Sequence, residues 1–490
     1  MSSRVTIGQG EIEGFLGSGI HKFLGIPYAQ APVGPLRWQV PQPPTTWTGV
    51  RSAKSYGPAC PQTTGAVFNL QVDRQSEDCL YLNVWTRTLD PEEKQPVMVW
   101  IHGGGFLGGA GSEDATDGTH LADKGVTVVS FNYRLGAFGY LAHADFGANF
   151  GVLDQIAALG WVKENIAAFG GNPDCITIFG QSAGAHSVRK LLATRLARGL
   201  FHRAILQSGG FEPPAFNVAW TYERTAAASN ALIQRLGGGR QAELRAVPTE
   251  VLKQVSHELC GVFPRPGQVH TPANLVWVPV EDGDVLTAED RLGAMTALPV
   301  LMGFTKNEAR YFIKPGQAHD EKVLEAMTRV MGREQAGSLL AALNGLDGGI
   351  YDRLDRIFTS SIWAEPAIAT ARIVARDNPR LFVYRFDRVS PGMQRSNELA
   401  KHTADIKYAF GNLQPPDGYD DIDANLTTFM QDAWISFART GAPLGMNGER
   451  WPPFTAGSEL GLIIDAIPAI SRVSDDAIVR LLHLVRSTGR

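Results

Sequence analysis

The chain has 490 residues, of which 44% are hydrophobic and 19% are charged, and its formal net charge is −4. This composition is typical of a large globular protein, and the acidic balance argues against a nucleic-acid-binding protein. No apolar run approaches the roughly 20 residues that span a bilayer, and the N-terminal segment lacks the apolar core of a signal peptide. We therefore expect a cytoplasmic protein with no membrane partner.

Short strand-like segments come first, at 5–7, 11–15 and 22–26, and alternate with proline-rich coil. Apolar runs and helical segments then alternate, which predicts an α/β protein with a mostly parallel sheet and helices on both faces. The runs that read as buried strands lie at 96–101, 126–131, 176–179, 203–207, 299–304 and 381–386, and helices are expected at 151–169, 424–439 and 475–485.

The alternation of predicted strands and helices becomes irregular at about 211–295, and the sequence is mostly helical at about 321–376. We interpret the first segment as an insertion around the functional site. The second lies between two predicted strands, so it adds helices to the same sheet. The sequence therefore predicts one domain spanning 1–490.

A strand-like run ends at Gly180-Gln181-Ser182-Ala183-Gly184, which fits the nucleophile-elbow motif G-x-S-x-G. The motif needs glycines because the chain turns so tightly that side chains beside the serine would clash. A chain with 53 glycines can match it by chance, but the preceding strand favours the elbow. Ser182 is therefore the candidate nucleophile.

A second glycine-rich stretch, His102-Gly103-Gly104-Gly105-Phe106, follows the predicted strand at 96–101. Successive glycines let backbone N–H groups point into a cavity, where they stabilise an oxyanion. The same stretch also satisfies the dinucleotide motif G-x-G-x-x-G, which requires a helix to follow. Residues 107–118 read as a loop, so we favour the oxyanion function.

An elbow enzyme orders its triad as serine, acid and histidine along the chain. Glu308 follows the predicted strand at 299–304, and His402 follows the one at 381–386. Taken singly, an acidic loop residue is usually a solvated charge and a lone histidine is usually structural. Their order after suitable strands predicts that Glu308 is the acid and His402 the base.

The chain contains four cysteines, too few for a disulfide scaffold of this length. Cys60 and Cys79 flank a short polar loop and are the one pair that we consider for a bridge. No C-x-x-C motif occurs, and no His/Cys cluster has zinc spacing. The sequence thus predicts no metal site.

Together these motifs resemble type-B carboxylesterases of the α/β-hydrolase superfamily, a group that includes bacterial esterases and cholinesterases. The similar stretches run in order through nearly the whole chain. They are FLGIPYAQAPVGPLRW at 23–38, SEDCLYLNVW at 76–85, WIHGGGF at 100–106, NYRLGAFGYL at 132–141, DQIAALGWVKENIAAFGGNP at 154–173, FGQSAGAHS at 179–187, GFTKNEAR at 303–310 and AKHTADIKYAFG at 400–411.

The resemblance implies an α/β-hydrolase fold and a serine hydrolase that needs no cofactor. Carried over residue by residue, it implies a catalytic triad, an oxyanion hole, a disulfide and two structural ion pairs. The triad would be Ser182, Glu308 and His402, and the oxyanion hole would be formed by the N–H groups of Gly104, Gly105 and Ala183. The disulfide would join Cys60 and Cys79. The two ion pairs would be Arg37 with Glu77 and Arg134 with Asp154.

Two features depart from the family pattern. Gln181 stands where the family usually has glutamate, so one negative charge beside the serine is missing. The loop between Cys60 and Cys79 is shorter than in cholinesterases and contains no tryptophan that would stack on choline. Both features argue against cholinesterase specificity.

We therefore expect an enzyme that cleaves small-molecule carboxylic esters through an acyl-enzyme, as a monomer or weak homo-oligomer. An amide or carbamate hydrolase with the same triad is the alternative, and a non-catalytic binding module on this fold is a further one. The substrate pocket should be apolar and built from loops around 106–112, 211–220, 262–277 and 305–312. Its candidate residues are Phe106, Gln181, Phe211, Phe312 and Trp363.

Overall fold

The structure is a computed structural model, and it describes residues 2–63, 72, 74–213, 220–261, 274–288, 292–313, 321–445, 448 and 450–488. Much of the predicted pocket loop at 262–277, and residues 214–219 of another, lie outside the described residues. The chain forms two compact units. The first comprises Met1–Ile205, Trp220–Phe263 and Asn274–Ala294, and the second comprises Leu206–Ala219, Pro264–Ala273 and Met295–Arg490. The single domain spanning 1–490 stays a prediction.

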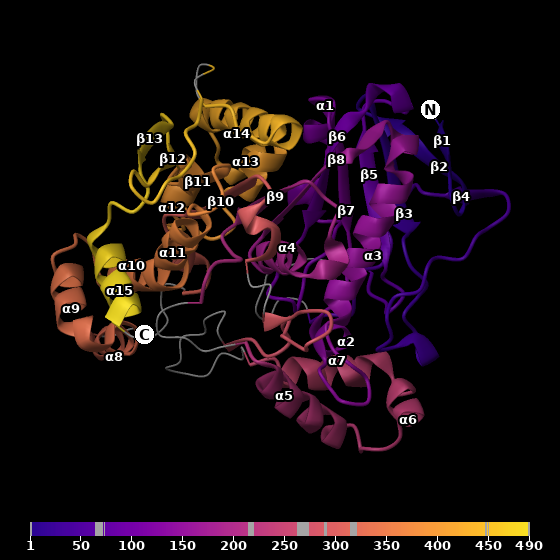
Figure 1. Cartoon of the computed structure of the whole chain (residues 1–490), viewed down its shortest axis with the longest axis horizontal. Helices are drawn as coiled ribbons and strands as arrows, with labels where there is room; N and C mark the ends of the chain where they lie inside the picture. Colours follow the sequence, from indigo (N-terminus) through magenta and orange to yellow (C-terminus); the bar gives the residue numbers. More distant parts are fainter. Residues whose placement is uncertain are drawn as a thin grey trace. The chain divides into compact units, whose positions relative to one another are not determined.

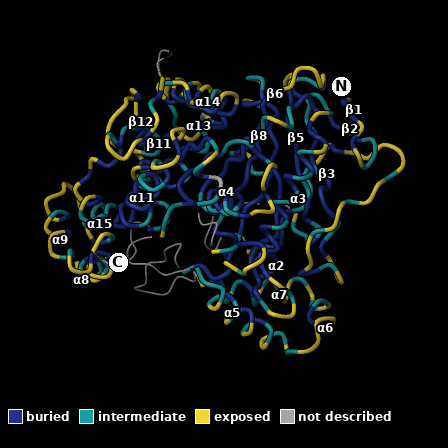
Figure 2. The backbone as a smooth tube through the Cα atoms, in the orientation of Figure 1, coloured by how far each residue is buried: buried dark blue, intermediate teal, exposed yellow. Residues whose placement is uncertain are grey.

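The first unit contains a twisted sheet whose N-terminal strands are antiparallel and whose later strands are parallel. Strands β6 and β8 consist largely of buried residues (Figure 2), as expected where helices cover a parallel sheet. In order across the sheet, the strands are β1 (Ser2–Ile7), β2 (Gly10–Gly17), β3 (Ile20–Pro27), β5 (Tyr81–Thr86), β7 (Thr127–Phe131), β6 (Gln95–Ile101) and β8 (Gly171–Gln181), with β4 (Val50–Ser52) pairing β2 (Figure 1).

Helices of the first unit pack on the parallel strands. Helix α3 (Phe150–Asn165) contacts β8, and α4 (Ala183–Ala193) contacts both β6 and β8. The predicted helix at 151–169 is thus α-helical to Asn165 and ends in a 3₁₀ turn, Ile166–Phe169. The other helices are α1 (Thr119–Asp123), α2 (Gly136–Tyr140), α5 (Tyr222–Arg235), α6 (Gln241–Arg245) and α7 (Thr249–Glu258).

Both ion pairs implied by the resemblance are present and buried. The Arg37 guanidinium donates to the Glu77 carboxylate, with Nε–Oε2 2.8 Å and Nη2–Oε1 2.5 Å. Arg134 donates to Asp154 through Nε at 2.8 Å and Nη2 at 2.7 Å. Bidentate geometry compensates much of the cost of removing these charges from water.

The second unit begins within β9 (Arg203–Gln207). Its strands β10 (Val300–Thr305), β11 (Leu381–Phe386) and β12 (Leu460–Ile464) are parallel, and β13 (Ala469–Arg472) is antiparallel to β12. Helix α11 (Glu365–Val374) packs on β10 and β11. The remaining helices include α12 (Pro391–Arg395), α13 (Ile406–Phe410) and α14 (Asp421–Thr440).

Residues 321–376, which the sequence predicts to be mostly helical, form a series of helices. It contains α8 (Glu321–Gly332), α9 (Ala336–Asn344), α10 (Ile350–Thr359) and the π-helical segment Ser360–Ala364, which leads into α11. The C-terminal helix α15 (Ala477–Thr488) packs against α8 and α9 (Figure 1). Their shared core is made of Ala309, Ile313, Leu324, Met331, Leu339, Leu343, Leu354, Ile357, Phe358, Ile478 and Leu482.

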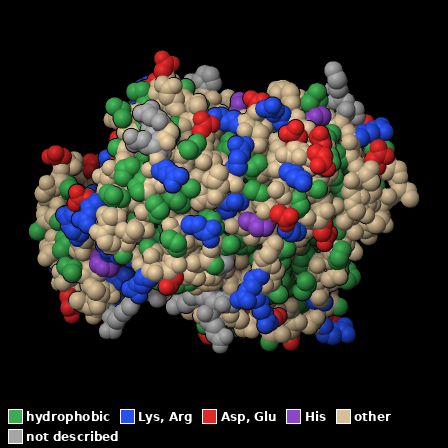
Figure 3. Space-filling model, turned by 45° about the horizontal axis from the view of Figure 1, so that its top comes forward, with side chains coloured by type: hydrophobic (Ala, Val, Ile, Leu, Met, Phe, Trp, Pro, Cys, Tyr) green, Lys and Arg blue, Asp and Glu red, His purple; other side chains and the backbone are tan. Residues whose placement is uncertain are grey.

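The surface carries both signs of charge. On the face drawn in Figure 3, Lys and Arg side chains are interspersed with Asp and Glu side chains and with scattered hydrophobic groups. This mixture agrees with the small net charge of −4. Within the described part of the chain, no helix has both the length and the apolar character to span a membrane.

Candidate active site

Ser182 lies at the sharp turn between β8 and α4. Its backbone has φ 57° and ψ −121°, a conformation that is strained for a residue with a side chain and is typical of a nucleophile elbow. A Cβ atom at Gly184 would lie 2.0 Å from the Ile101 carbonyl oxygen. Glycine is therefore required where α4 starts close against β6.

The glycine loop predicted to stabilise an oxyanion follows β6. Gly104 has φ 98°, and a Cβ atom there would lie 2.1 Å from the Gly108 carbonyl oxygen. The turn closes through N–H groups of Leu107 and Gly108, each 3.0 Å from the Gly104 carbonyl oxygen. Among the described residues, the Gly104 and Gly105 N–H groups have no hydrogen-bond acceptor.

Ala183 supplies a third candidate donor, because it is the first residue of α4 and the first amides of a helix have no intrahelical partner. No helix opens after the glycine loop. A 3₁₀ turn at Asp114–Thr116 comes first, and α1 starts only at Thr119. The strand–turn–helix context of a dinucleotide site is therefore missing.

Buried side chains pack together beside the glycine loop. The His102 ring stacks on Tyr133 with centroids 4.3 Å apart, and the Tyr133 hydroxyl donates to the His102 carbonyl at 2.8 Å. Burial lowers the pKa of His102 to about 4, so this imidazole is neutral at neutral pH. Burial raises the pKa of Glu113 to about 7, against the lowering effect of the Ala110 N–H group.

The structure brings Glu308 and His402 together within the second unit. Nδ1 of His402 is hydrogen-bonded to Oε2 of Glu308, and the two residues are 2% and 0% exposed. Oε1 of Glu308 accepts from the Thr305 N–H at 2.8 Å. Since an ionised carboxylate only accepts, we place the imidazole proton on Nδ1, which leaves Nε2 as a base.

Asp355 on α10 holds the turn that carries Glu308. Its Oδ2 accepts from Asn307 Nδ2 at 2.7 Å and from Arg310 Nε at 3.2 Å. On the same helix, Thr359 Oγ1 accepts from the Ala309 N–H at 3.1 Å. Asn307, Ala309 and Arg310, on both sides of Glu308, are thus anchored to one helix, which fixes the position of the candidate acid.

A further buried carboxylate, Asp405, lies near this pair. Its Oδ2 accepts from the Tyr384 hydroxyl at 2.6 Å and from Gln207 Nε2 at 2.9 Å. Burial raises the pKa of Asp405, and the negative charge of Glu308 raises it further. Asp405 was not predicted as a site residue, because its partners lie 21 and 198 residues away along the chain.

Aromatic rings surround the His402 imidazole in the second unit. Centroids of Phe312, Trp363 and Tyr311 lie 5.1, 5.6 and 5.9 Å from that of His402. Phe312 and Trp363 are stacked, with centroids 5.4 Å apart. Tyr311 was not among the predicted pocket residues, although it is adjacent to Phe312 in an aromatic pair.

The other predicted pocket residues are distributed over both units. In the first unit, Phe106 has no exposed surface. Its ring centroid lies 5.0 Å from that of Tyr140 and 5.9 Å from that of Trp220, so Phe106 packs on the buried side of the glycine loop. Gln181 is also buried, with 2% exposed. Phe211, in the second unit, is partly exposed. Their roles in substrate binding remain predictions.

Cys60 and Cys79 both lie buried in the first unit. They are free thiols, so the bridge implied by the resemblance is not formed in this structure. Among the described residues, no group of three or more His, Cys, Asp or Glu side chains could hold a metal ion.

A strained serine between a strand and a helix, and a glycine loop after the neighbouring strand, are the parts of an α/β-hydrolase. The model of the carboxylesterase family matches residues 1–475. Para-nitrobenzyl esterase of Bacillus subtilis (strain 168) is 37% identical over 486 residues, covering 94% of each chain. Fumonisin B1 esterase of Sphingopyxis macrogoltabida is 35% identical, covering 92% of this chain and 86% of that protein.

The solved structure of a PNB esterase has a TM-score of 0.83 and 34% identity, and the match covers 98% of this chain and 100% of that one. The α/β-hydrolase fold, with a large, mostly parallel sheet and helices on both sides, is thereby confirmed. The chain belongs to the carboxylesterase family and is an enzyme of the carboxylic ester hydrolase class.

Proposed function

We propose that this enzyme cleaves carboxylic esters through a triad of Ser182, His402 and Glu308 and a covalent acyl-enzyme. The observation that carries the proposal is the hydrogen bond between the buried Glu308 carboxylate and His402 Nδ1. This contact holds the imidazole in the tautomer whose Nε2 accepts a proton. The strained backbone at Ser182 supports its role as the nucleophile.

In the first step, His402 Nε2 takes the proton of Ser182 Oγ while this oxygen attacks the ester carbonyl. Negative charge develops on the carbonyl oxygen. The N–H groups of Gly104, Gly105 and Ala183 stabilise it, and each such donor contributes roughly 10²–10³-fold in rate. Glu308 stabilises the charged imidazolium that forms at the same time.

The tetrahedral intermediate then collapses. Its bond to the alcohol oxygen breaks, and this oxygen takes the proton from His402. Ser182 is left acylated. His402 then removes a proton from a water molecule, which attacks the acyl carbon, and the second intermediate releases the carboxylic acid and restores the serine hydroxyl. Bonds and protons balance with the ester and one water molecule alone.

Replacing the nucleophile tests this proposal. We expect Ser182→Ala to lower kcat for a p-nitrophenyl ester by several powers of ten, because the covalent step is lost. The matched control is Ser396→Ala, which removes an exposed hydroxyl on the turn after α12. Activity of S182A within about tenfold of the wild type would overturn the proposal.

An amide or carbamate hydrolase would use the same groups, so the leaving group distinguishes the alternatives. A matched ester and anilide, assayed in parallel, should show faster cleavage of the ester. A non-catalytic binding module would neither hydrolyse these substrates nor react with a fluorescent organophosphonate. We expect the wild type to be labelled covalently and S182A to remain unlabelled.

A further inference from the structure

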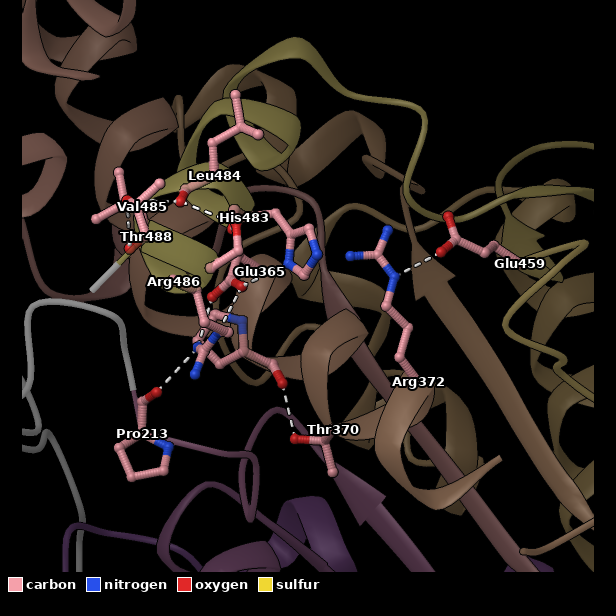
Figure 4. Close-up of polar contacts among 12 residues, drawn as sticks. Pro213, Glu365, Thr370, Arg372, Glu459, His483, Leu484, Val485, Arg486 and Thr488 are labelled. Carbon is pink, nitrogen blue, oxygen red and sulfur yellow. Dashed lines mark hydrogen bonds and ion pairs between the residues drawn. The ribbon is translucent and has the colours of Figure 1, made fainter. Parts of the chain in front are cut away.

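Glu365 is a buried carboxylate that the proposed chemistry does not use. Its side chain is 2% exposed at the start of α11, and Arg486 on α15 binds it in a bidentate manner, with both N–O distances 2.6 Å. His483 Nδ1 lies 3.5 Å from the same carboxylate (Figure 4). Burial favours the neutral acid, but the hydrogen bonds from Arg486 and the nearby His483 ring outweigh it and lower the pKa of Glu365.

Arg486 also reaches a second segment of the second unit. Its Nη2 donates to the Pro213 carbonyl oxygen at 2.9 Å (Figure 4). One residue earlier, the Glu212 N–H donates to Thr370 Oγ1 on α11 at 2.7 Å. The backbone at 211–213 is therefore tied to both α11 and α15, and Phe211 lies directly in this tied segment.

Trp363 connects this ion pair to the candidate active site. It lies two residues before Glu365, in the π-helical segment Ser360–Ala364. Its ring stacks on Phe312 and lies 5.6 Å from the His402 ring. A π-helical turn is unfavourable by itself and persists where surrounding contacts hold it. The salt bridge at Glu365 anchors the residue immediately after this turn.

We propose that the Glu365–Arg486 ion pair is a specificity-determining positioning device, which fixes the Trp363 ring and the 211–213 backbone and so limits the size of the apolar ester group that packs beside His402. The proposal rests on the proposed ester-hydrolase function. Glu365 and Arg486 are positioning residues that act through Trp363 and touch no substrate. Their partnership joins positions 121 residues apart, so the C-terminal helix takes part in substrate selection.

The test compares Arg486→Gln with Arg480→Gln on the same helix. Arg480 forms an exposed ion pair with Asp475, where the two side chains are 61% and 72% exposed, so R480Q serves as the matched control. Values of kcat and KM are measured for two ester series. One lengthens the acyl chain from acetate to octanoate on a p-nitrophenyl alcohol, and the other enlarges the alcohol of an acetate ester.

If the Trp363 ring is no longer held in place, larger ester groups should fit beside His402. We expect R486Q to raise the ratio of kcat/KM for the bulkiest ester over the smallest by about 3–10-fold in one series, with kcat for the smallest ester within about twofold of the wild type. The series that responds identifies whether the acyl or the alcohol group packs against Trp363. Arg486→Lys keeps the charge but loses the bidentate hydrogen bonds. Its ratio of kcat/KM values should therefore lie between those of the wild type and R486Q.

An unchanged ratio, or an equal loss of kcat/KM for every ester, would overturn the inference. If R486Q fails to fold, the double variant Glu365→Gln/Arg486→Met removes both charges without leaving one buried alone, and the same ratio decides. A failure here differs from a failure of the proposed function. In the first case S182A is inactive while the ratio stays constant, and in the second case S182A retains activity.

Discussion

Gln181 is the residue before the candidate nucleophile, and we predict that its neutral side chain affects the choice of substrate. It is buried at the end of β8, with 2% of its surface exposed. An amide there is neutral, whereas a carboxylate would place a negative charge beside Ser182. In a site with a low effective dielectric, such a charge acts more strongly than it would in water.

We expect Gln181→Glu to favour cationic esters. The ratio of kcat/KM for a choline ester over its neutral isostere should rise by about 3–10-fold, because the new charge attracts the ammonium group. Gln254→Glu, an exposed position on α7, adds the same charge away from the site and is the control. A ratio that does not exceed that of Q254E would show that residue 181 has no electrostatic influence on the substrate.

At the scale of elements, the loop after β6 combines a glycine turn with buried ionisable groups. Glu113 accepts a hydrogen bond from the Ala110 N–H at 3.1 Å. Burial raises its pKa from 4.5 to about 7. Between these two pH values, the folded chain keeps a proton that the unfolded chain has released. The stabilising contribution of Glu113 to the free energy of unfolding is therefore fully present below pH 4.5. It is lost as the pH rises from 4.5 to about 7.

We expect Glu113→Gln to remove this pH dependence. The free energy of unfolding of the wild type minus that of E113Q should fall as the pH rises from about 4.5 to about 7 and then level off, as measured by chemical denaturation. Glu164→Gln on α3 alters an exposed carboxylate and is the control. A difference that stays constant, or that grows with pH, would contradict the prediction.

Elements were predicted well where local sequence was unambiguous. The apolar runs at 96–101, 126–131 and 381–386 became β6, β7 and β11 with shifts of at most one residue at either end. Strand β5 was not predicted, because Tyr81-Leu82-Asn83 mixes polar and apolar residues in a strand buried among others. The π-helical turn at Trp363 also gave no local signal, since long-range contacts hold it.

At the scale of the whole molecule, buried ion pairs join distant parts of each unit. Arg134 and Asp154 are 3% and 0% exposed, and Asp154 accepts three hydrogen bonds from Arg134, including one from its backbone N–H at 3.0 Å. Removing one charge leaves the other buried and unpaired. The stability of the enzyme should therefore depend far more on this pair than on exposed pairs.

We expect Asp154→Asn to lower the free energy of unfolding by about 3–5 kcal/mol. Asp174→Asn breaks the exposed pair with Lys163, where Asp174 is 81% exposed, and should lower the free energy of unfolding far less, because water screens an exposed pair. Denaturant titration of both variants provides the comparison. Equal losses in the two variants would mean that burial gives the Arg134–Asp154 pair no special weight.

The sequence by itself determined the features that depend on neighbouring residues. Glycines at 180 and 184 and the apolar run before them specify the turn at Ser182, because the required backbone conformation and close packing are local. The alternation of apolar runs and helices likewise specified an α/β fold. The resemblance added the ion pairs, whose partners no local rule could have matched.

Only the tertiary structure decided which distant side chains meet. Glu308 and His402 are 94 residues apart, and Glu365 and Arg486 are 121 apart. Contacts of this kind depend on the order of strands across a sheet and on how helices pack, which periodicity along the chain does not encode. The hydrogen bond between Glu308 and His402 and the bonds of Asp355 with Asn307 and Arg310 became visible for this reason.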